Sequence, residues 1–261
     1  MLFIFRELKN GFRHLFPTGR FRFVLIILSG IAATISVSEL LVMKFFATLV
    51  LHEDEYSSTK LLVAAIGFFI FFILTRLSQF YQRNYRVKAF ARSFRAAKKE
   101  ITAKEENREW AMAFELTNLL SQGTQLIAIL LFFAVLNPLI AAINLLILFV
   151  VLQVVGNLFQ KQIAIQAEIN ALGGKKKVKP AKRYGVRIKA AETGALTSGA
   201  GTLVLLGLLL WLSVDGQITP ANTLVIFLGA RLQNSVISNG SRSLMRYAKS
   251  NSRTVDDDDF E

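Results

Sequence analysis

The stretch that decides the fold is LLSQGTQLIAILLFFAVLNPLIAAINLLILFVVLQVVGNLF, residues 119–159. It contains two apolar runs, 119–136 and 139–159, and the only break between them is Asn137-Pro138. A helix needs about 20 mostly apolar residues to cross the hydrocarbon core of a bilayer, and each run is close to that length. Proline is well tolerated in the first turn of a helix, where its missing N–H has no partner to lose. The stretch therefore predicts two membrane-spanning helices joined as a tight antiparallel hairpin.

Four further apolar stretches have a comparable length. They are 23–51, 61–80, 196–214 and 220–237. The composition agrees, because 53% of the 261 residues are hydrophobic, 22 of them Phe, and they fall in blocks. The first stretch is also longer than the ~7–15 residue apolar core of a cleaved signal peptide, so we interpret it as a retained span. We predict an all-α, polytopic membrane protein with six transmembrane helices within residues 20–250.

Lysine and arginine are concentrated in alternate connections between these stretches. The basic segments are 1–22, 81–118, 160–195 and 238–253. The other three connections, 52–60, 137–138 and 215–219, together hold one Lys and no Arg. Basic connections stay on the cytoplasmic side, so both termini are predicted to be cytoplasmic in a plasma (inner) membrane. Attraction to anionic membrane lipids accounts for the net charge of +13 without a nucleic-acid partner.

The first 19 residues have an amphipathic helical pattern, with apolar and basic side chains on separate faces. The apolar residues are Phe5, Leu8, Phe12 and Leu15, and the basic residues are Arg6, Lys9 and Arg13. A helix of this kind lies in the membrane interface, with its apolar face toward the acyl chains. Pro17-Thr18-Gly19 then breaks the helix before the first span. We predict an interfacial helix over residues 1–19, with a frayed basic tail as the alternative.

Two cytoplasmic connections are long and helical in composition. Residues 139–172 contain no Pro and a single Gly, and after a turn at 173–180 the helical composition resumes to about residue 213. At about 1.5 Å per residue each arm is roughly 50 Å long, so about 20 Å should extend beyond the hydrocarbon core. Residues 80–120 also lack Gly and Pro. We therefore predict two long cytoplasmic helical hairpins.

An elbow helix, six spans, short outer connections and two long cytoplasmic hairpins together resemble the transmembrane domain of an ABC exporter. Gly216-Gln217-Ile218-Thr219-Pro220 is also similar to the outer turn before the sixth helix of that family. The resemblance implies a homo- or heterodimer that moves a substrate by alternating access. It also implies that the two cytoplasmic turns contact nucleotide-binding subunits. The candidate coupling residues are Lys98, Lys99, Glu100, Gly173, Gly174, Lys175, Lys176 and Lys177.

The chain lacks the motifs of an ATPase or another enzyme. It contains no Gly-x-x-x-x-Gly-Lys-Ser/Thr motif, which would cradle nucleotide phosphates. It has no Cys, and its two His, His14 and His52, are far apart, so no metal, cofactor or catalytic site is predicted. ATP and magnesium would act only through a partner ATPase or a domain outside this sequence. The acidic tail, 251–261, is predicted to be disordered.

Five polar or charged residues lie within the first and sixth predicted spans. They are Glu39, Lys44, Arg231, Gln233 and Asn234. An unpaired charge at the bilayer centre costs at least ~2.5–3.5 kcal/mol, so these side chains need partners or water. Glu39 and Arg231 lie at nearly equal distances along the chain from the outer ends of their spans. We predict that they pair, across helices or protomers, either on a translocation path or as a structural lock.

The fourth span carries three polar residues of its own, Asn144, Gln153 and Asn157. The last two are separated by four residues and share one helix face. Polar side chains in spans usually form hydrogen bonds to neighbouring helices, and we expect that here.

Three functions fit these observations. The first is an exporter-type transmembrane subunit driven by ATPase subunits. The second is an ATPase-free transporter on the same scaffold, driven by a proton gradient with Glu39 as the proton carrier. The third is an accessory or structural subunit whose hairpins form a docking platform for a larger assembly.

Overall fold

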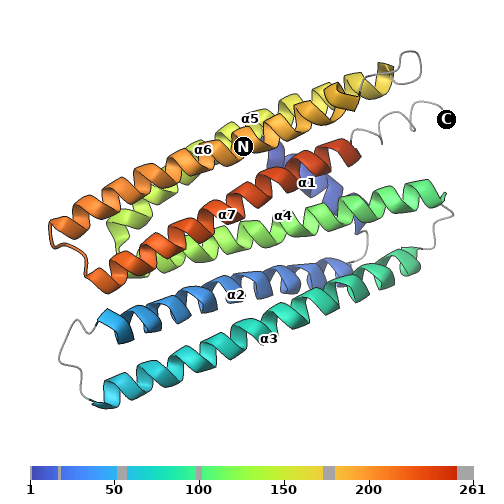
Figure 1. Cartoon of the computed structure of the whole chain (residues 1–261). Helices are drawn as coiled ribbons and strands as arrows, with labels where there is room; N and C mark the ends of the chain where they lie inside the picture. Colours follow the sequence, from blue (N-terminus) through green and yellow to red (C-terminus); the bar gives the residue numbers. More distant parts are fainter. Residues whose placement is uncertain (1, 17–18, 52–57, 98–101, 173–179, 252–261) are drawn as a thin grey trace.

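The structure is a computed structural model of the chain, and it describes residues 2–16, 19–51, 58–97, 102–172 and 180–251. These residues form seven α-helices and no strand. The helices are α1 (Leu2–Leu15), α2 (Gly19–Leu51), α3 (Ser58–Ala97), α4 (Ala103–Leu136), α5 (Pro138–Leu172), α6 (Pro180–Val214) and α7 (Pro220–Asn251). In Figure 1 the six long helices run side by side, whereas α1 crosses them. The predicted all-α fold is confirmed for the described residues.

Five helices, α2 to α6, are long and apolar enough to cross a membrane. The candidate spans are Arg22–Leu51, Leu62–Gln82, Glu105–Leu136, Pro138–Ile169 and Tyr184–Val214. A membrane protein with several spans is therefore supported. The predicted sixth span, in α7, does not reach the same apolarity, because polar residues such as Arg231, Gln233 and Asn234 interrupt it. That span stays a prediction.

Helix α7 lies in the middle of the bundle. It packs against α2, α4, α5 and α6, whereas α3 packs mainly against α2. Figure 1 shows the ends of α2, α4 and α6 together with the starts of α3, α5 and α7 at the left end of the bundle. The helix ends next to the three connections that hold almost no Lys or Arg therefore share one end of the bundle.

The turn between α4 and α5 is the tight hairpin expected from Asn137-Pro138. The N–H of Asn137 donates to the carbonyl oxygen of Phe133 at 2.8 Å, which closes the last turn of α4. The side-chain oxygen of Asn137 accepts from the N–H of Ile140 at 3.0 Å, which starts α5. One asparagine thus caps two helices, and Pro138 needs no hydrogen-bond acceptor.

Long helices flank both predicted cytoplasmic connections. Helix α5 packs against α6, whereas α3 packs mainly against α2 and not closely against α4, so among the described residues the first predicted hairpin is not a packed pair. The extension of these helices into the cytoplasm stays a prediction. Helices α5 and α6 have 35 residues each, and α3 and α4 have 40 and 34. The start of α4 is fixed by a capping box, in which the Thr102 hydroxyl accepts from the Glu105 N–H and the Glu105 carboxylate accepts from the Thr102 N–H. This box satisfies two backbone N–H donors at the start of α4. Residues 98–101, which precede it, lie outside the described part.

The turn between α6 and α7 contains Gly216, Ile218 and Thr219. Gly216 adopts a φ of 71°, a conformation that glycine reaches without steric cost. Ile218 is buried, and the Thr219 hydroxyl accepts from the N–H of Asn222 at 3.3 Å. The motif therefore combines a turn glycine, an apolar anchor and a helix cap.

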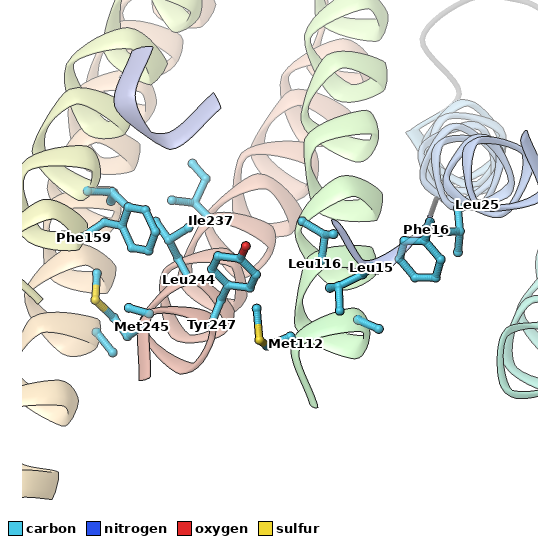
Figure 2. Packing of buried hydrophobic residues seen from close by; sticks show 14 of the residues in the cluster. Leu15, Phe16, Leu25, Met112, Leu116, Phe159, Ile237, Leu244, Met245 and Tyr247 are labelled. Carbon is cyan, nitrogen blue, oxygen red and sulfur yellow. The ribbon is translucent and has the colours of Figure 1, made fainter. Parts of the chain in front are cut away.

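A buried cluster holds α1 against the rest of the bundle. Leu15 and Phe16 are buried with Leu25 of α2, Met112 and Leu116 of α4, Phe159 of α5, and Leu244, Met245 and Tyr247 of α7 (Figure 2). Gly11 faces the Tyr247 hydroxyl so closely that a side chain at this position would collide with it. Leu8, Phe12 and Leu15 belong to this cluster or pack against it, so they face the bundle, whereas Phe5 is 60% exposed. The position of α1 in the membrane interface stays a prediction.

Burial of Tyr247 makes the free energy of unfolding depend on pH. The side chain lies beyond the predicted sixth span, and desolvation, together with the nearby Glu7 carboxylate, raises the pKa of Tyr247 to about 12. An unfolded tyrosine has a pKa of about 10, so between pH 10 and 12 the unfolded state loses its proton first. The free energy of unfolding should therefore fall by up to roughly 3 kcal/mol over this range through this residue alone.

Chemical denaturation of the wild type and Tyr247→Phe at pH 9, 10, 11 and 12 measures this contribution. Between pH 10 and 12 the free energy of unfolding of the wild type should fall relative to that of Tyr247→Phe, because only the wild type carries the phenol. A difference that stays constant with pH would contradict the prediction.

Candidate functional site

Helix α7 carries two different faces along its length. One face is exposed and polar, and we call it the polar face of α7. It comprises Arg231, Ser235, Asn239, Arg242 and Arg246, spaced by three or four residues and all exposed. The opposite face is buried and mostly apolar, with Val225, Ile226, Ala230 and Val236 in the core. An exposed polar face on the central helix of an otherwise apolar bundle is the strongest candidate site.

Two arginines near the C-terminal end of the polar face have carboxylate partners. Arg242 lies 3.2 Å from Glu192 of α6, and both side chains are about half exposed, at 50% and 52%. Arg246 lies 2.8 Å from the largely buried Glu115 of α4. The exposed Arg242–Glu192 pair contributes 1 kcal/mol or less to stability. Arg246, in contrast, neutralises the charge of the largely buried Glu115, which would be costly without a partner.

Arg231 differs from both of these arginines. Among the described residues, no carboxylate lies within ion-pairing distance of its guanidinium. Its side chain is exposed, at a depth that the predicted span would place inside the bilayer. A lone charge is costly in lipid, so within the predicted span Arg231 would require water or a group from another chain beside it.

Asn234 connects the polar face to α6. The Ser198 hydroxyl donates to the side-chain oxygen of Asn234 at 2.7 Å. This bond and the Arg242–Glu192 contact place residues 192–198 of α6 along one side of the polar face. Asn234, one of the five polar residues predicted from the sequence, therefore lies beside the polar face of α7 and contacts α6.

Gln233, in contrast, points away from the polar face and pairs with Asn144 of α5. The two amides form reciprocal hydrogen bonds of 2.8 and 2.9 Å, and their residues are only 3% and 0% exposed. All the polar atoms that face each other are satisfied, so the pair can lie within an apolar core. The predicted interhelical bond of Asn144 is confirmed, and Gln233 is placed in a structural contact.

Replacing Asn144 by Leu should destabilise the bundle by about 1–3 kcal/mol, because the Gln233 amide is left buried without a partner. Gln233→Leu should have a similar effect. The double Leu variant should lose less than the sum of the two, with a coupling of roughly 0.5–2 kcal/mol. Unfolding in mixed micelles measures all four proteins, and strict additivity would contradict the pairing.

Glu39 has partners on α3 that the sequence analysis did not identify. The Gln79 amide donates to the Glu39 carboxylate at 3.0 Å, and Arg76 donates to the Gln79 side-chain oxygen at 3.3 Å. The predicted Glu39–Arg231 pair is therefore not formed within the chain, because Glu39 faces α3 while Arg231 lies on the exposed side of α7. A pair across protomers stays a prediction. Arg76 and Gln79 could have been identified from the sequence, because they are two polar residues three positions apart within an otherwise apolar span.

Lys44 lies apart from Glu39 in a shallow groove between α2 and α3. The groove has a volume of about 290 Å³ and is lined by Lys44, Phe45, Thr48, Thr59, Val63 and Ala64. It does not adjoin the polar face of α7. The five polar residues predicted to lie within spans are therefore found in three places: Arg231, Gln233 and Asn234 on α7, Glu39 at the contact of α2 with α3, and Lys44 in this groove.

Gln153 and Asn157 lie on an exposed side of α5. The Gln153 amide donates to the Asn157 side-chain oxygen at 3.4 Å, so these residues bond along the helix. The buried side of α5 is occupied instead by Asn144, Val151 and Val155, and of the three polar residues Asn144 is the one in the core.

The candidate coupling residues lie outside the described part of the structure. They are Lys98, Lys99, Glu100, Gly173, Gly174, Lys175, Lys176 and Lys177. Within the described ranges, no group of three or more His, Cys, Asp or Glu residues is arranged to hold a metal ion.

No protein-family model matches the chain, and no curated protein shows significant similarity to it. The site is therefore argued from its geometry.

Proposed function

We propose that the chain is the transmembrane subunit of an ABC exporter-like transporter, and that the polar face of α7 lines the path of its substrate. The observation that carries this proposal is the exposed row from Arg231 to Arg246 on the central helix. Polar side chains in membrane spans face water-filled cavities or other protein rather than lipid. A row of them along the bundle is suited to a polar or anionic substrate.

The position of α7 supports a sixth span despite its low apolarity. A helix surrounded by α2, α4, α5 and α6 is shielded from lipid on its buried side, so it does not need to be apolar all round. With six spans, both termini lie on the cytoplasmic side, in agreement with the distribution of Lys and Arg.

The uncovered polar face also supports a second six-helix subunit. A homo- or heterodimer that brought two such faces together would enclose a polar space and remove Arg231 from lipid. The long arms of α5 and α6 would extend into the cytoplasm, where nucleotide-binding subunits could contact their turn. The chain itself would supply no ATPase activity.

Purification from its native membrane, followed by identification of bound chains, tests this proposal directly. We expect a nucleotide-binding ATPase to co-purify, and ATP to stimulate substrate movement in vesicles containing the complex. Transport without nucleotide but with a pH gradient would favour the proton-driven alternative. A stable complex with no ATPase and no transport would support an accessory role and contradict the proposal.

A further inference from the structure

An apolar cavity opens on the side of the bundle between α4 and α5. Its volume is about 360 Å³, within the range of small-molecule sites. Leu148, Ile237 and Leu244 line it as buried residues, whereas Ile127, Leu145 and Phe149 line it as exposed ones, at 60%, 53% and 57%. Because the exposed residues belong to two candidate spans, the medium outside the cavity is the hydrocarbon of the bilayer.

Helix α1 closes one end of this cavity. Ile4, Phe5 and Leu8 contribute to its lining, and Arg6 and Lys9 next to them are exposed. The helix at this end of the cavity, predicted to be cytoplasmic, thus carries two exposed cations within one turn of the lining residues. Each Lys or Arg near an anionic membrane surface contributes about 1 kcal/mol to attraction, so these cations are complementary to an anionic head group.

One polar atom of the lining has no partner. The side-chain oxygen of Gln122 is buried and accepts no hydrogen bond among the described residues. Gln122 lines the cavity next to Gly240, where a side chain would come within 3.1 Å of this oxygen. A buried acceptor is costly to leave unsatisfied, and a hydroxyl group of a bound molecule would satisfy it.

We propose that this cavity binds an anionic glycerophospholipid of the cytoplasmic leaflet, with one acyl chain between α4 and α5 and the head group at Arg6 and Lys9. The acyl chain matches the apolar walls, the phosphate matches the two exposed cations of α1, and a hydroxyl of a polyol head group, as in phosphatidylglycerol, can donate to Gln122. This inference concerns lipid binding on the outside of the bundle, and it does not depend on transport along α7.

The full chain in nanodiscs tests the proposal with a phosphatidylglycerol that carries a photoactivatable acyl chain. Cross-links should map to residues 119–130 and 145–155. Gly123→Leu should reduce this labelling at least tenfold, because its side chain would enter a cavity that is open at this position. Gly199→Leu, on α6, also meets no neighbour and is the matched control that should label like the wild type.

A second measurement keeps the test independent of any effect of Gly123→Leu on folding. Unlabelled phosphatidylglycerol should compete for labelling better than phosphatidylcholine, and the double Arg6→Gln, Lys9→Gln variant should lose this preference several-fold. Lys189→Gln, which removes an exposed charge on α6, should keep it. Equal labelling of the two glycine variants, competition without head-group preference, or cross-links to a second copy of the chain would overturn the proposal.

Discussion

Replacing Arg231 by Met should reduce substrate transport at least tenfold and leave the bundle assembled. Among the described residues the guanidinium makes no ion pair, so its removal leaves no carboxylate of this chain unpaired. The side chain is exposed on the polar face of α7, so the core around Val225 and Ala230 is unchanged. A loss of function without a loss of stability is the signature of a residue that contacts substrate or a partner subunit. Transport in proteoliposomes and unfolding of the purified protein measure the two effects separately.

The matched control is Lys189→Met, which removes an exposed charge on α6 outside the polar face and should transport like the wild type. Arg242→Met, on the same face as Arg231, breaks an exposed pair with Glu192, so it should change stability by 1 kcal/mol or less. Arg231→Lys should retain part of the activity if charge alone is required. Wild-type transport by Arg231→Met would remove the main support for a substrate path along α7.

The same series tests a Glu39–Arg231 pair across protomers. If Glu39 of the partner subunit faces Arg231, then Glu39→Gln should restore activity to Arg231→Met, because it removes the carboxylate left unpaired. If Glu39 acts only through Gln79 and Arg76 within its own chain, the double variant should be no more active than Arg231→Met.

Gly229→Leu should destabilise the bundle by about 3 kcal/mol or more and reduce the yield of folded protein. A Cβ atom at this position would lie 2.6 Å from Phe133 Cε1 and 3.0 Å from Leu40 Cδ2. Both neighbours are fully buried, so they have no free space into which to move. Overpacking of this kind forces side chains off their rotamers or separates helices, here α2, α4 and α7 together.

Gly207→Leu is the control, because nothing lies within 4 Å of a Cβ atom at that exposed position of α6. It should be neutral or slightly stabilising, since leucine has a higher helix propensity than glycine. Phe133→Ala combined with Gly229→Leu should recover part of the lost stability by making room for the new side chain. Equal stability of the two glycine variants would show that α7 does not pack against α4 as closely as described.

The boundaries of the helices followed from the sequence because they depend on local properties. Asn137-Pro138 separates two apolar runs, and the structure ends α4 and starts α5 on either side of Asn137. Glycine and proline likewise marked the ends of α6 and the start of α7. Proline, glycine and asparagine act on the backbone within a few residues, so they end or start a helix however the helices pack.

The hydrogen-bond partners of the polar residues could not be predicted from the sequence in the same way. Depth along a span suggested that Glu39 faces Arg231, but depth leaves the rotation of each helix about its axis undetermined. In the structure Glu39 bonds to Gln79, and Gln233 bonds to Asn144, which lies 89 residues earlier in the chain. A difference of one residue, from Gln233 to Asn234, changes the direction of a side chain by about 100°.

The sequence by itself thus determined a helical membrane protein, its tight hairpin and its long matched arms, because periodicity, apolar length and turn residues are local. Only the tertiary structure separated the polar residues of α7 into a buried lock at Gln233 and an exposed row that begins at Arg231. The physical reason is that burial depends on which neighbours surround a helix face. Those neighbours, from α2, α4, α5 and α6, are brought together only by the fold.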